Sequence, residues 1–293
     1  MPYLTLEALL FILPISWFSY EVQLVPDLKT FIFQGTCKIK FSIDPSKLDD
    51  TNKNVISLHS KELCISSAQY VVLESTDEIT TTPVSACEIL LNVKATTVEF
   101  RFEKDIPANA KTIQLTINYI GYLNNQMAGF YRSEYTNMDG VKKMMASTQF
   151  ESLDARRCFP CFDEPGVKAI FSVQLTVDSA YDVLSNMPIS CKQMISSTTK
   201  IVTFMDTPIM STYLLAICVG EFDMVQTTTS HGVIVSVYTP PGKSHMGEYA
   251  LRTASLALSA YDDFFQVPYP LPKLDMIAIP EFAMGAMEVC ERT

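Results

Sequence analysis

Three histidines, His59, His231 and His245, are the first residues to test for metal chemistry. Zinc peptidases of the H-E-x-x-H type place two histidines four residues apart on one helix, with a glutamate between them that activates water. A glutamate follows His59 and His245 after three residues, as in the inverted form of that motif, but Leu63 and Tyr249 occupy the position of the second histidine. We therefore expect three separate surface histidines and no metal site.

Cysteine and serine offer two further arrangements. Cys158 and Cys161 form one C-x-x-C pair without a second pair or a neighbouring histidine, which favours two packed thiols in a turn over a metal or redox site. Ser244 lies between Gly242 and Gly247, one residue away from the spacing of a nucleophile elbow, which favours a serine in a polar loop. The sequence therefore predicts no catalytic residue.

The composition limits the partners of the chain. Its net charge of −10 would repel a phosphate backbone, so nucleic acid is not expected, whereas the cationic α-amine of a peptide suits this charge. The eight cysteines are scattered along the chain, and no Asn-x-Ser/Thr glycosylation acceptor occurs. Both features are typical of a reduced, cytoplasmic setting.

Residues 1–19 form an atypical apolar N-terminal segment. Its apolar core, residues 8–18, has the length of a signal-peptide core, but no lysine or arginine precedes it and Glu7 stands where positive charge is expected. The segment is also shorter than the roughly 20 residues of a membrane-spanning helix. We expect no membrane span; secretion or membrane association through this segment is the alternative.

The elements that must position any functional residue begin at Tyr20. Apolar and polar residues alternate with a period of two, which buries one face of a β-strand and leaves the other in water. Turn residues separate the alternating stretches, as in an antiparallel β-sandwich or saddle. We place this domain at residues 20–225, with its clearest strands at 98–102, 113–117, 171–177 and 213–218.

The pattern changes after about residue 240. Apolar residues within 251–265 recur at steps of three and four, which lines one face of a helix. Three prolines between 268 and 272 prevent the helix from continuing, and strand character returns at 274–279. We place a domain change near the polar stretch 227–230 and assign residues 226–293 to a second, incomplete domain.

Two stretches carry a more particular order of residues. Residues 148–165 read T-Q-F-E-S-L-D-A-R-R-C-F-P-C-F-D-E-P, and residues 285–288 read G-A-M-E. In both, the chain resembles the gluzincin family of aminopeptidase N and puromycin-sensitive aminopeptidase, which has a matching T-Q-F-E block and the exopeptidase signature G-A-M-E-N. Further blocks follow in the family's order, at 129–133, 185–188, 207–213 and 220–222.

This resemblance implies a mainly β fold: an antiparallel, saddle-like β-sandwich, then the opening part of a thermolysin-like α+β catalytic domain. The implied activity is zinc-dependent removal of N-terminal residues from peptides. The sequence departs from the family after Glu288, and the blocks that carry the zinc ligands and the catalytic tyrosine are absent. We expect a truncated form without bound zinc that is inactive alone. A non-catalytic module that binds peptides, or associates with a full-length relative, is the alternative.

The resemblance also implies a substrate site for peptides with a free N-terminus. Glu288 and Glu151 would bind the α-amine, and Gln149 would line the pocket for the first side chain. The backbone of the signature would hold the peptide as a neighbouring strand does. The predicted substrate-binding residues are therefore Gln149, Glu151, Gly285, Ala286, Met287 and Glu288. Arg156, Asp163 and Glu164 are predicted to fix turns near the domain junction.

Overall fold

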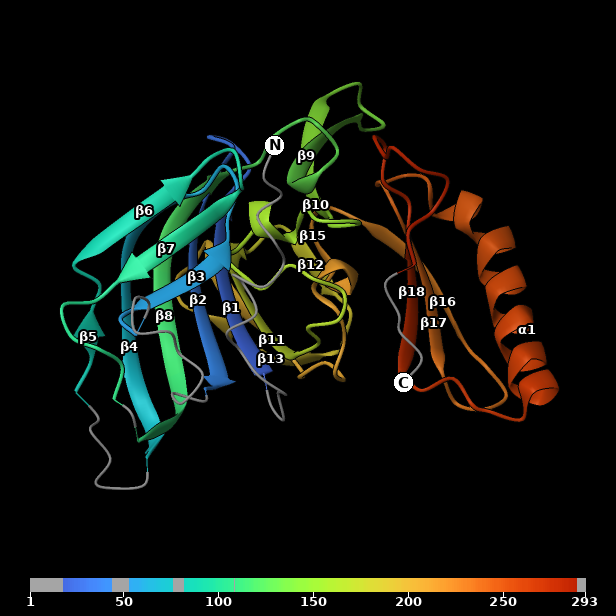
Figure 1. Cartoon of the computed structure of the whole chain (residues 1–293). Helices are drawn as coiled ribbons and strands as arrows, with labels where there is room; N and C mark the ends of the chain where they lie inside the picture. The colour runs from blue at the N-terminus through green and yellow to red at the C-terminus, as the bar shows by residue number, and fades with distance from the viewer. Residues whose placement is uncertain (1–17, 44–52, 76–81, 108, 289–293) are drawn as a thin grey trace.

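The computed structural model describes residues 18–43, 53–75, 82–107 and 109–288. It is mainly β, with a broad curved sheet at one side and a small sheet beside one long helix at the other (Figure 1). Most of the predicted N-terminal segment lies outside the described residues, but Phe18 and Ser19 already belong to the first strand. None of the described helices has the length and apolarity needed to cross a bilayer.

An eight-stranded sheet is the largest layer. Its order is β13-β14-β11-β1-β2-β8-β4-β5, and every neighbouring pair is antiparallel except β1 and β11, which run parallel. The strand that begins the described chain therefore lies inside the sheet. The strands are β1 (Phe18–Asp27), β2 (Ile32–Ser42), β4 (Cys64–Ser75), β5 (Val84–Ser85), β8 (Ala110–Tyr122), β11 (Ile170–Asp178), β13 (Ile189–Met194) and β14 (Thr199–Phe204).

A three-stranded sheet forms the second layer of the sandwich, in the order β3-β7-β6. Its strands are β3 (Val55–His59), β6 (Glu88–Asn92) and β7 (Thr97–Arg101). The ring of Phe102, just after β7, meets the ring of Tyr70 on β4 edge to face, with 4.7 Å between centroids. This contact ties the two layers together.

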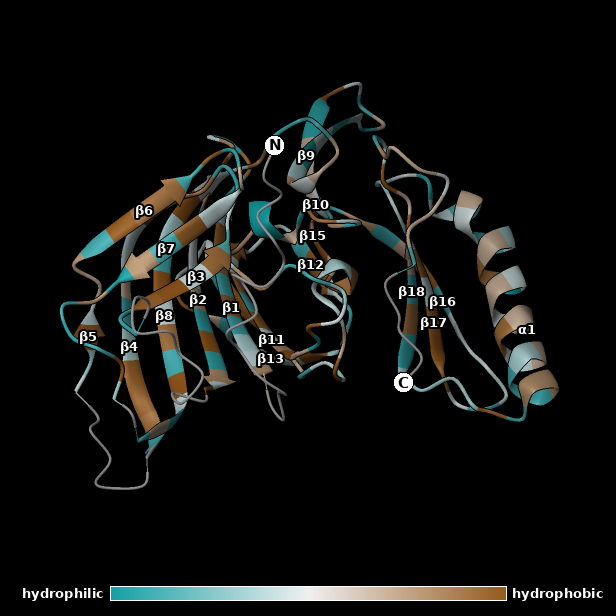
Figure 2. Ribbon diagram, in the orientation of Figure 1, coloured by the Kyte–Doolittle hydropathy of each residue, from teal (hydrophilic) through white to brown (hydrophobic). Residues whose placement is uncertain are grey.

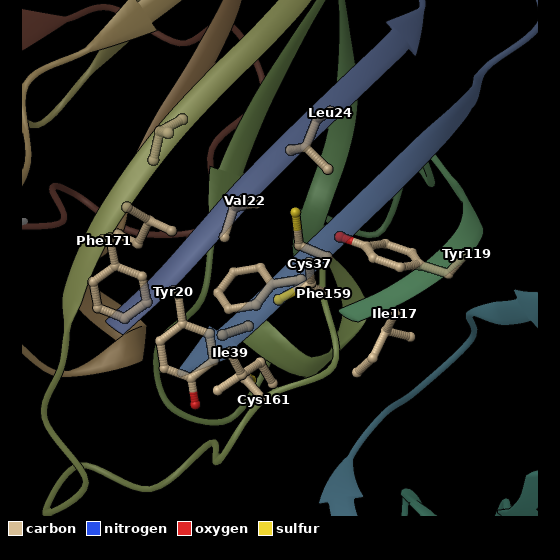
Figure 3. Packing of buried hydrophobic residues seen from close by; sticks show 14 of the residues in the cluster. Tyr20, Val22, Leu24, Cys37, Ile39, Ile117, Tyr119, Phe159, Cys161 and Phe171 are labelled. Carbon is tan, nitrogen blue, oxygen red and sulfur yellow. The ribbon is translucent and has the colours of Figure 1, made fainter. Parts of the chain in front are cut away.

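The core between the layers follows the predicted alternation. In Figure 3 the ring of Tyr20 on β1 stacks on Phe171 of β11, with 5.1 Å between centroids, and Phe159 meets both rings edge-on. Burial of this apolar surface is the main term that favours folding. The predicted strand residues that are buried here are Val98, Phe100, Phe102, Ile113, Leu115, Ile117, Phe171, Val173, Leu175 and Val177.

A four-stranded sheet adjoins the sandwich, in the order β12-β15-β10-β9. The strand predicted at 213–218 is partly wrong, because β15 starts only at Ile217 and residues 212–214 form a short 3-10 helix, η4 (Thr212–Leu214). The side chain of Asn186 explains this: its amide donates to Leu214 O and accepts from Ala216 N, both at 2.8 Å, which replaces strand pairing. The strands are β9 (Gly129–Thr136), β10 (Lys142–Gln149), β12 (Asp182–Ser185) and β15 (Ile217–Gly220).

The C-terminal part combines a three-stranded sheet with one helix. In the order β16-β17-β18, β17 and β18 run parallel, and the helix α1 lies on the connection between them. The predicted helix and the following strand are thus confirmed. Residues 227–230 lie at the end of β16 and in the hairpin to β17, and the domain boundary placed there stays a prediction. The elements are β16 (Asp223–Thr228), β17 (Ile234–Thr239), η5 (Ser244–Gly247), α1 (Glu248–Phe265) and β18 (Lys273–Ile277).

The apolar face of α1 is only partly covered. Leu251, Ala254 and Leu258 are half-buried beside β16 and β17, whereas Tyr261 and Phe265 on the same face remain exposed. In the view of Figure 2, hydrophobic and hydrophilic residues alternate along α1.

Candidate functional site

Gln149 ends strand β10 with its side chain buried. The residue is 4% exposed, and neither the oxygen nor the nitrogen of its carboxamide has a hydrogen-bond partner among the described residues. Burying an amide without partners costs about 1–3 kcal/mol, so buried amides are normally paired. This carboxamide therefore keeps one acceptor and one donor group whose hydrogen-bonding capacity is unused.

Glu151 lies in the turn that follows β10. Its side chain is exposed, and a hydrogen bond from Asp154 N to Phe150 O (2.9 Å) closes the turn. The Asp154 carboxylate in turn accepts a 2.7 Å hydrogen bond from Arg157 Nε, and the guanidinium of Arg157 also pairs with Glu62. The turn that carries Glu151 is thereby fixed against the loop after β3.

The signature residues lie in an open loop after β18. Gly285, Ala286 and Glu288 are exposed, and a Cβ atom added at Gly285 would meet nothing within 4 Å. Met287 is half-buried against the hydrophobic core. The backbone at 285–286 is therefore accessible, while its neighbour Met287 holds the loop to the core.

One face of the four-stranded sheet brings Gln149 and this loop together. Ser147 and Gln149 are two residues apart on β10 and so share a face, and Tyr131 lies opposite Ser147 on β9. The hydroxyl of Tyr131 donates a 2.9 Å hydrogen bond to Glu281 O, within the same loop as residues 285–288. Gln149 therefore points to the same side of the sheet as the loop that carries residues 285–288, and Glu151 follows two residues later. The roles assigned to these residues stay predictions.

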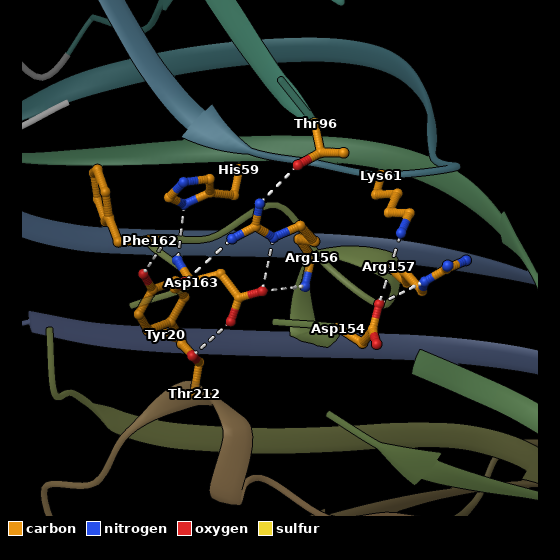
Figure 4. A network of polar contacts seen from close by, with 10 residues as sticks. All are labelled: Tyr20, His59, Lys61, Thr96, Asp154, Arg156, Arg157, Phe162, Asp163 and Thr212. Atoms are coloured by element: carbon orange, nitrogen blue, oxygen red, sulfur yellow. Dashed lines mark hydrogen bonds and ion pairs between the residues drawn. The ribbon is translucent and has the colours of Figure 1, made fainter. Parts of the chain in front are cut away.

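The prediction that His59 is a surface histidine is wrong. The residue is 7% exposed, and its Nδ1 accepts a 3.1 Å hydrogen bond from Asp163 N (Figure 4). An isolated bridge between His59 and Cys161, with N–H···O distances of 2.9 and 3.1 Å, lays the 158–163 turn over the end of β3. Burial, and then the nearby charge of Arg156, lower the pKa of His59 to about 4. Strand alternation gave no sign of this burial, because it comes from a distant turn.

Arg156 and Asp163 form the buried centre of this polar network. Arg156 Nε lies 2.9 Å from Asp163 Oδ2, and Thr212 Oγ1 donates to Asp163 Oδ1 at 2.9 Å. Arg156 Nη1 also donates to Thr96 Oγ1 at 2.7 Å, which links the network to the layer of β3, β6 and β7. A buried ion pair whose other atoms are hydrogen-bonded suits a structural role.

The remaining predicted groups are dispersed. Cys158 and Cys161 are buried and unpaired, and burial raises the pKa of both thiols well above the usual value, as expected of packed, unreactive thiols. His245 is exposed on η5, which directly precedes α1. His231 Nδ1 lies 3.0 Å from Oδ2 of Asp262, near the C-terminal end of α1. Within the described ranges, no three His, Cys, Asp or Glu side chains form a group that could hold a metal ion.

Comparison with known proteins gives consistent matches. Residues 18–214 match the family described as the Peptidase M1 N-terminal domain, and residues 249–291 match the Peptidase family M1 domain. The chain is 43% identical over 272 residues to Aminopeptidase M1-A of Oryza sativa subsp. japonica and 42% identical over 269 residues to Aminopeptidase M1 of Arabidopsis thaliana. It is 39% identical over 272 residues to Puromycin-sensitive aminopeptidase of Caenorhabditis elegans. Each alignment covers 92% of this chain but only 27–29% of the relative.

Proposed function

The chain belongs to the peptidase M1 family, and we propose that it supplies the part of a zinc aminopeptidase that recognises the free N-terminus of a peptide. The observation that carries this proposal is the buried, unpartnered carboxamide of Gln149, on the face of the sheet where the loop of residues 285–288 lies. Glu151, just beyond Gln149, adds an exposed carboxylate near this face.

Each residue has a distinct chemical task in the proposed site. The carboxylates of Glu151 and Glu288 accept hydrogen bonds from the α-ammonium group, each contributing about 1.5–3 kcal/mol. Gln149 offers both a donor and an acceptor to the first residue of the peptide. The accessible backbone of Gly285 and Ala286 lies beside the peptide as a strand would, and Met287 fixes this backbone against the sandwich.

Zinc would supply the water activation that the family's chemistry needs. The residues of this chain do not fit its ligand set, because His59 accepts a hydrogen bond from Asp163 N while His231 and His245 lie at opposite ends of α1. We therefore propose that residues 1–293 alone do not catalyse hydrolysis. The unpaired state of the described cysteines supports a cytoplasmic setting for this function.

A second candidate is a non-catalytic module that associates with a full-length relative. The observation in its favour is the exposed aromatic surface of α1, where Tyr249 is 81% and Phe264 is 78% exposed. Apolar surface of this kind marks interaction sites when it is contiguous. Size-exclusion chromatography of this chain mixed with a full-length relative would distinguish this role, since peptide recognition alone needs no such complex.

The proposed site is tested by NMR titration of the 293-residue chain with a short peptide and with its N-acetylated form. Two charge-assisted hydrogen bonds, each near the low end of about 1.5–3 kcal/mol, give about 3–4 kcal/mol before ordering costs, so we expect a dissociation constant of about 1 mM or weaker. Acetylation should abolish binding, and Glu151→Gln should weaken it. Glu103→Gln, an exposed glutamate beyond β7, is the matched control. Micromolar binding that ignores acetylation would refute recognition of an α-amine.

A further inference from the structure

The loop of residues 279–288 depends on side chains for its position. It contains no helix or strand, so no ladder of backbone hydrogen bonds holds it. Before the loop, Lys273 Nζ donates a 2.8 Å hydrogen bond to Ser185 O on β12. Near its end, Met287 packs against the buried hydrophobic core. Between these two anchors, side chains of the four-stranded sheet contact the loop at the carbonyl of Glu281.

Two hydroxyl groups of β9 face that carbonyl. Tyr131 donates its hydrogen bond to Glu281 O at 2.9 Å, and Ser133 Oγ lies 3.5 Å from the same oxygen. Both residues are fully buried, so neither side chain is free to turn toward solvent. Burial raises the pKa of Tyr131, which keeps its hydroxyl protonated and able to donate at neutral pH.

We propose that Tyr131 is a positioning residue for the amine site: through the carbonyl of Glu281 it sets where the loop of residues 285–288 stands relative to Gln149. The inference rests on the proposed function above. It adds to the substrate-binding residues a residue that does not touch the peptide itself.

The strand register explains how one hydroxyl sets this geometry. Tyr131 pairs across to Ser147 on β10, and Gln149 follows two residues later on the same face. Tyr131 and Gln149 thus project from one rigid base, and Gln149 lies about 7 Å along β10 from the residue that pairs with Tyr131. Only three residues lie between Glu281 and Gly285, so a shift at this carbonyl should be felt at residues 285–288.

The test removes one oxygen atom. Tyr131→Phe keeps the buried ring and deletes the hydroxyl. In the variant we expect the carbonyl-carbon signal of Glu281 and the methyl signal of Met287 to move, with other methionine signals unchanged. We also expect affinity for the free-amine peptide to fall about three- to tenfold, in line with one lost hydrogen bond. The urea midpoint of Tyr131→Phe, which reports global stability, should shift much less than the midpoint of a variant whose core is disrupted.

Tyr135→Phe is the matched control. Tyr135 lies on the same face of β9 and is buried, and its hydroxyl has no hydrogen-bond partner among the described residues. The same substitution there should leave Glu281, Met287 and peptide affinity as in the wild type.

The outcomes separate this inference from the proposed function. Unchanged Glu281 and Met287 signals in Tyr131→Phe would overturn the positioning role, whatever the peptide does. Signals that move while the wild-type chain binds no peptide would support the positioning of the loop and refute the amine site. Should Tyr131→Phe fail to fold, Ser133→Ala removes the second hydroxyl: a shift confined to residues 279–288 supports the proposal, and an unchanged loop overturns it.

Discussion

Acidification should destabilise this chain through His59. The folded protein holds the ring neutral, with its Nδ1 accepting from Asp163 N. Unfolding frees the ring to take up a proton at its ordinary pKa of 6.5, whereas burial and Arg156 lower the folded value to about 4. The unfolded state therefore binds more protons between these values, so the contribution of His59 is present above pH 6.5 and is lost as the pH falls toward 4.

The magnitude follows from the two pKa values. The full difference corresponds to at most about 3 kcal/mol, and between pH 7.5 and pH 5 about 2 kcal/mol should disappear. Urea unfolding at both pH values measures this loss. His59→Asn keeps an acceptor for Asp163 N but removes the titrating ring, so the variant should lose about 2 kcal/mol less than the wild type over the same interval.

His245→Asn is the control. Because His245 is exposed on η5, this substitution should leave the pH dependence of the unfolding free energy as in the wild type. Equal losses in the wild type and in His59→Asn would refute the reasoning. An NMR titration gives a second check: a His59 ring that takes up its proton near pH 6.5 in the folded chain would show that burial does not govern it.

Three further predictions concern the core, the ion pair and the activity. Arg156→Met leaves the carboxylate of Asp163 buried without its cation and should cost about 3–5 kcal/mol in urea unfolding. Gly35→Ala should cost about 1–3 kcal/mol by the same measurement, because the added Cβ would lie 2.3 Å from the ring of Tyr119; Gly166→Ala, with open space around it, should show no clash of this kind. Residues 1–293 with added zinc should not hydrolyse aminoacyl-nitroanilides, and turnover that a chelator abolishes after repurification would contradict this.

Strand alternation and short motifs predicted much of the fold because both are local signals. The apolar positions of 98–102, 113–117 and 171–177 are all buried as the period of two requires. The resemblance implied a mainly β fold and the aminopeptidase N family, and the strands of the structure and the family match confirm both.

The rest depended on contacts between residues far apart in the chain. His59 is buried by a turn about 100 residues further on. Asn186 bonds the backbone at Leu214 and Ala216, so the strand expected at 213–218 begins only at Ile217. The substrate-site prediction named Gln149 and Glu151 from a motif but missed Tyr131. Residues 129–133, which include Tyr131, were used only as one of the blocks that match the family, because no local signal links Tyr131 to the carbonyl of Glu281, 150 residues away.

The parallel pairing of β1 with β11 has a consequence for synthesis on the ribosome. Strand β1 can pair with β11 only after Ile170 has been synthesised, 151 residues after Ser19, which takes about 8–30 s at about 5–20 residues per second. Until then, β1 offers an unpaired edge to other nascent chains. We expect chaperone dependence to be highest in this interval, and nascent chains arrested before and after β14 should differ sharply in protease resistance.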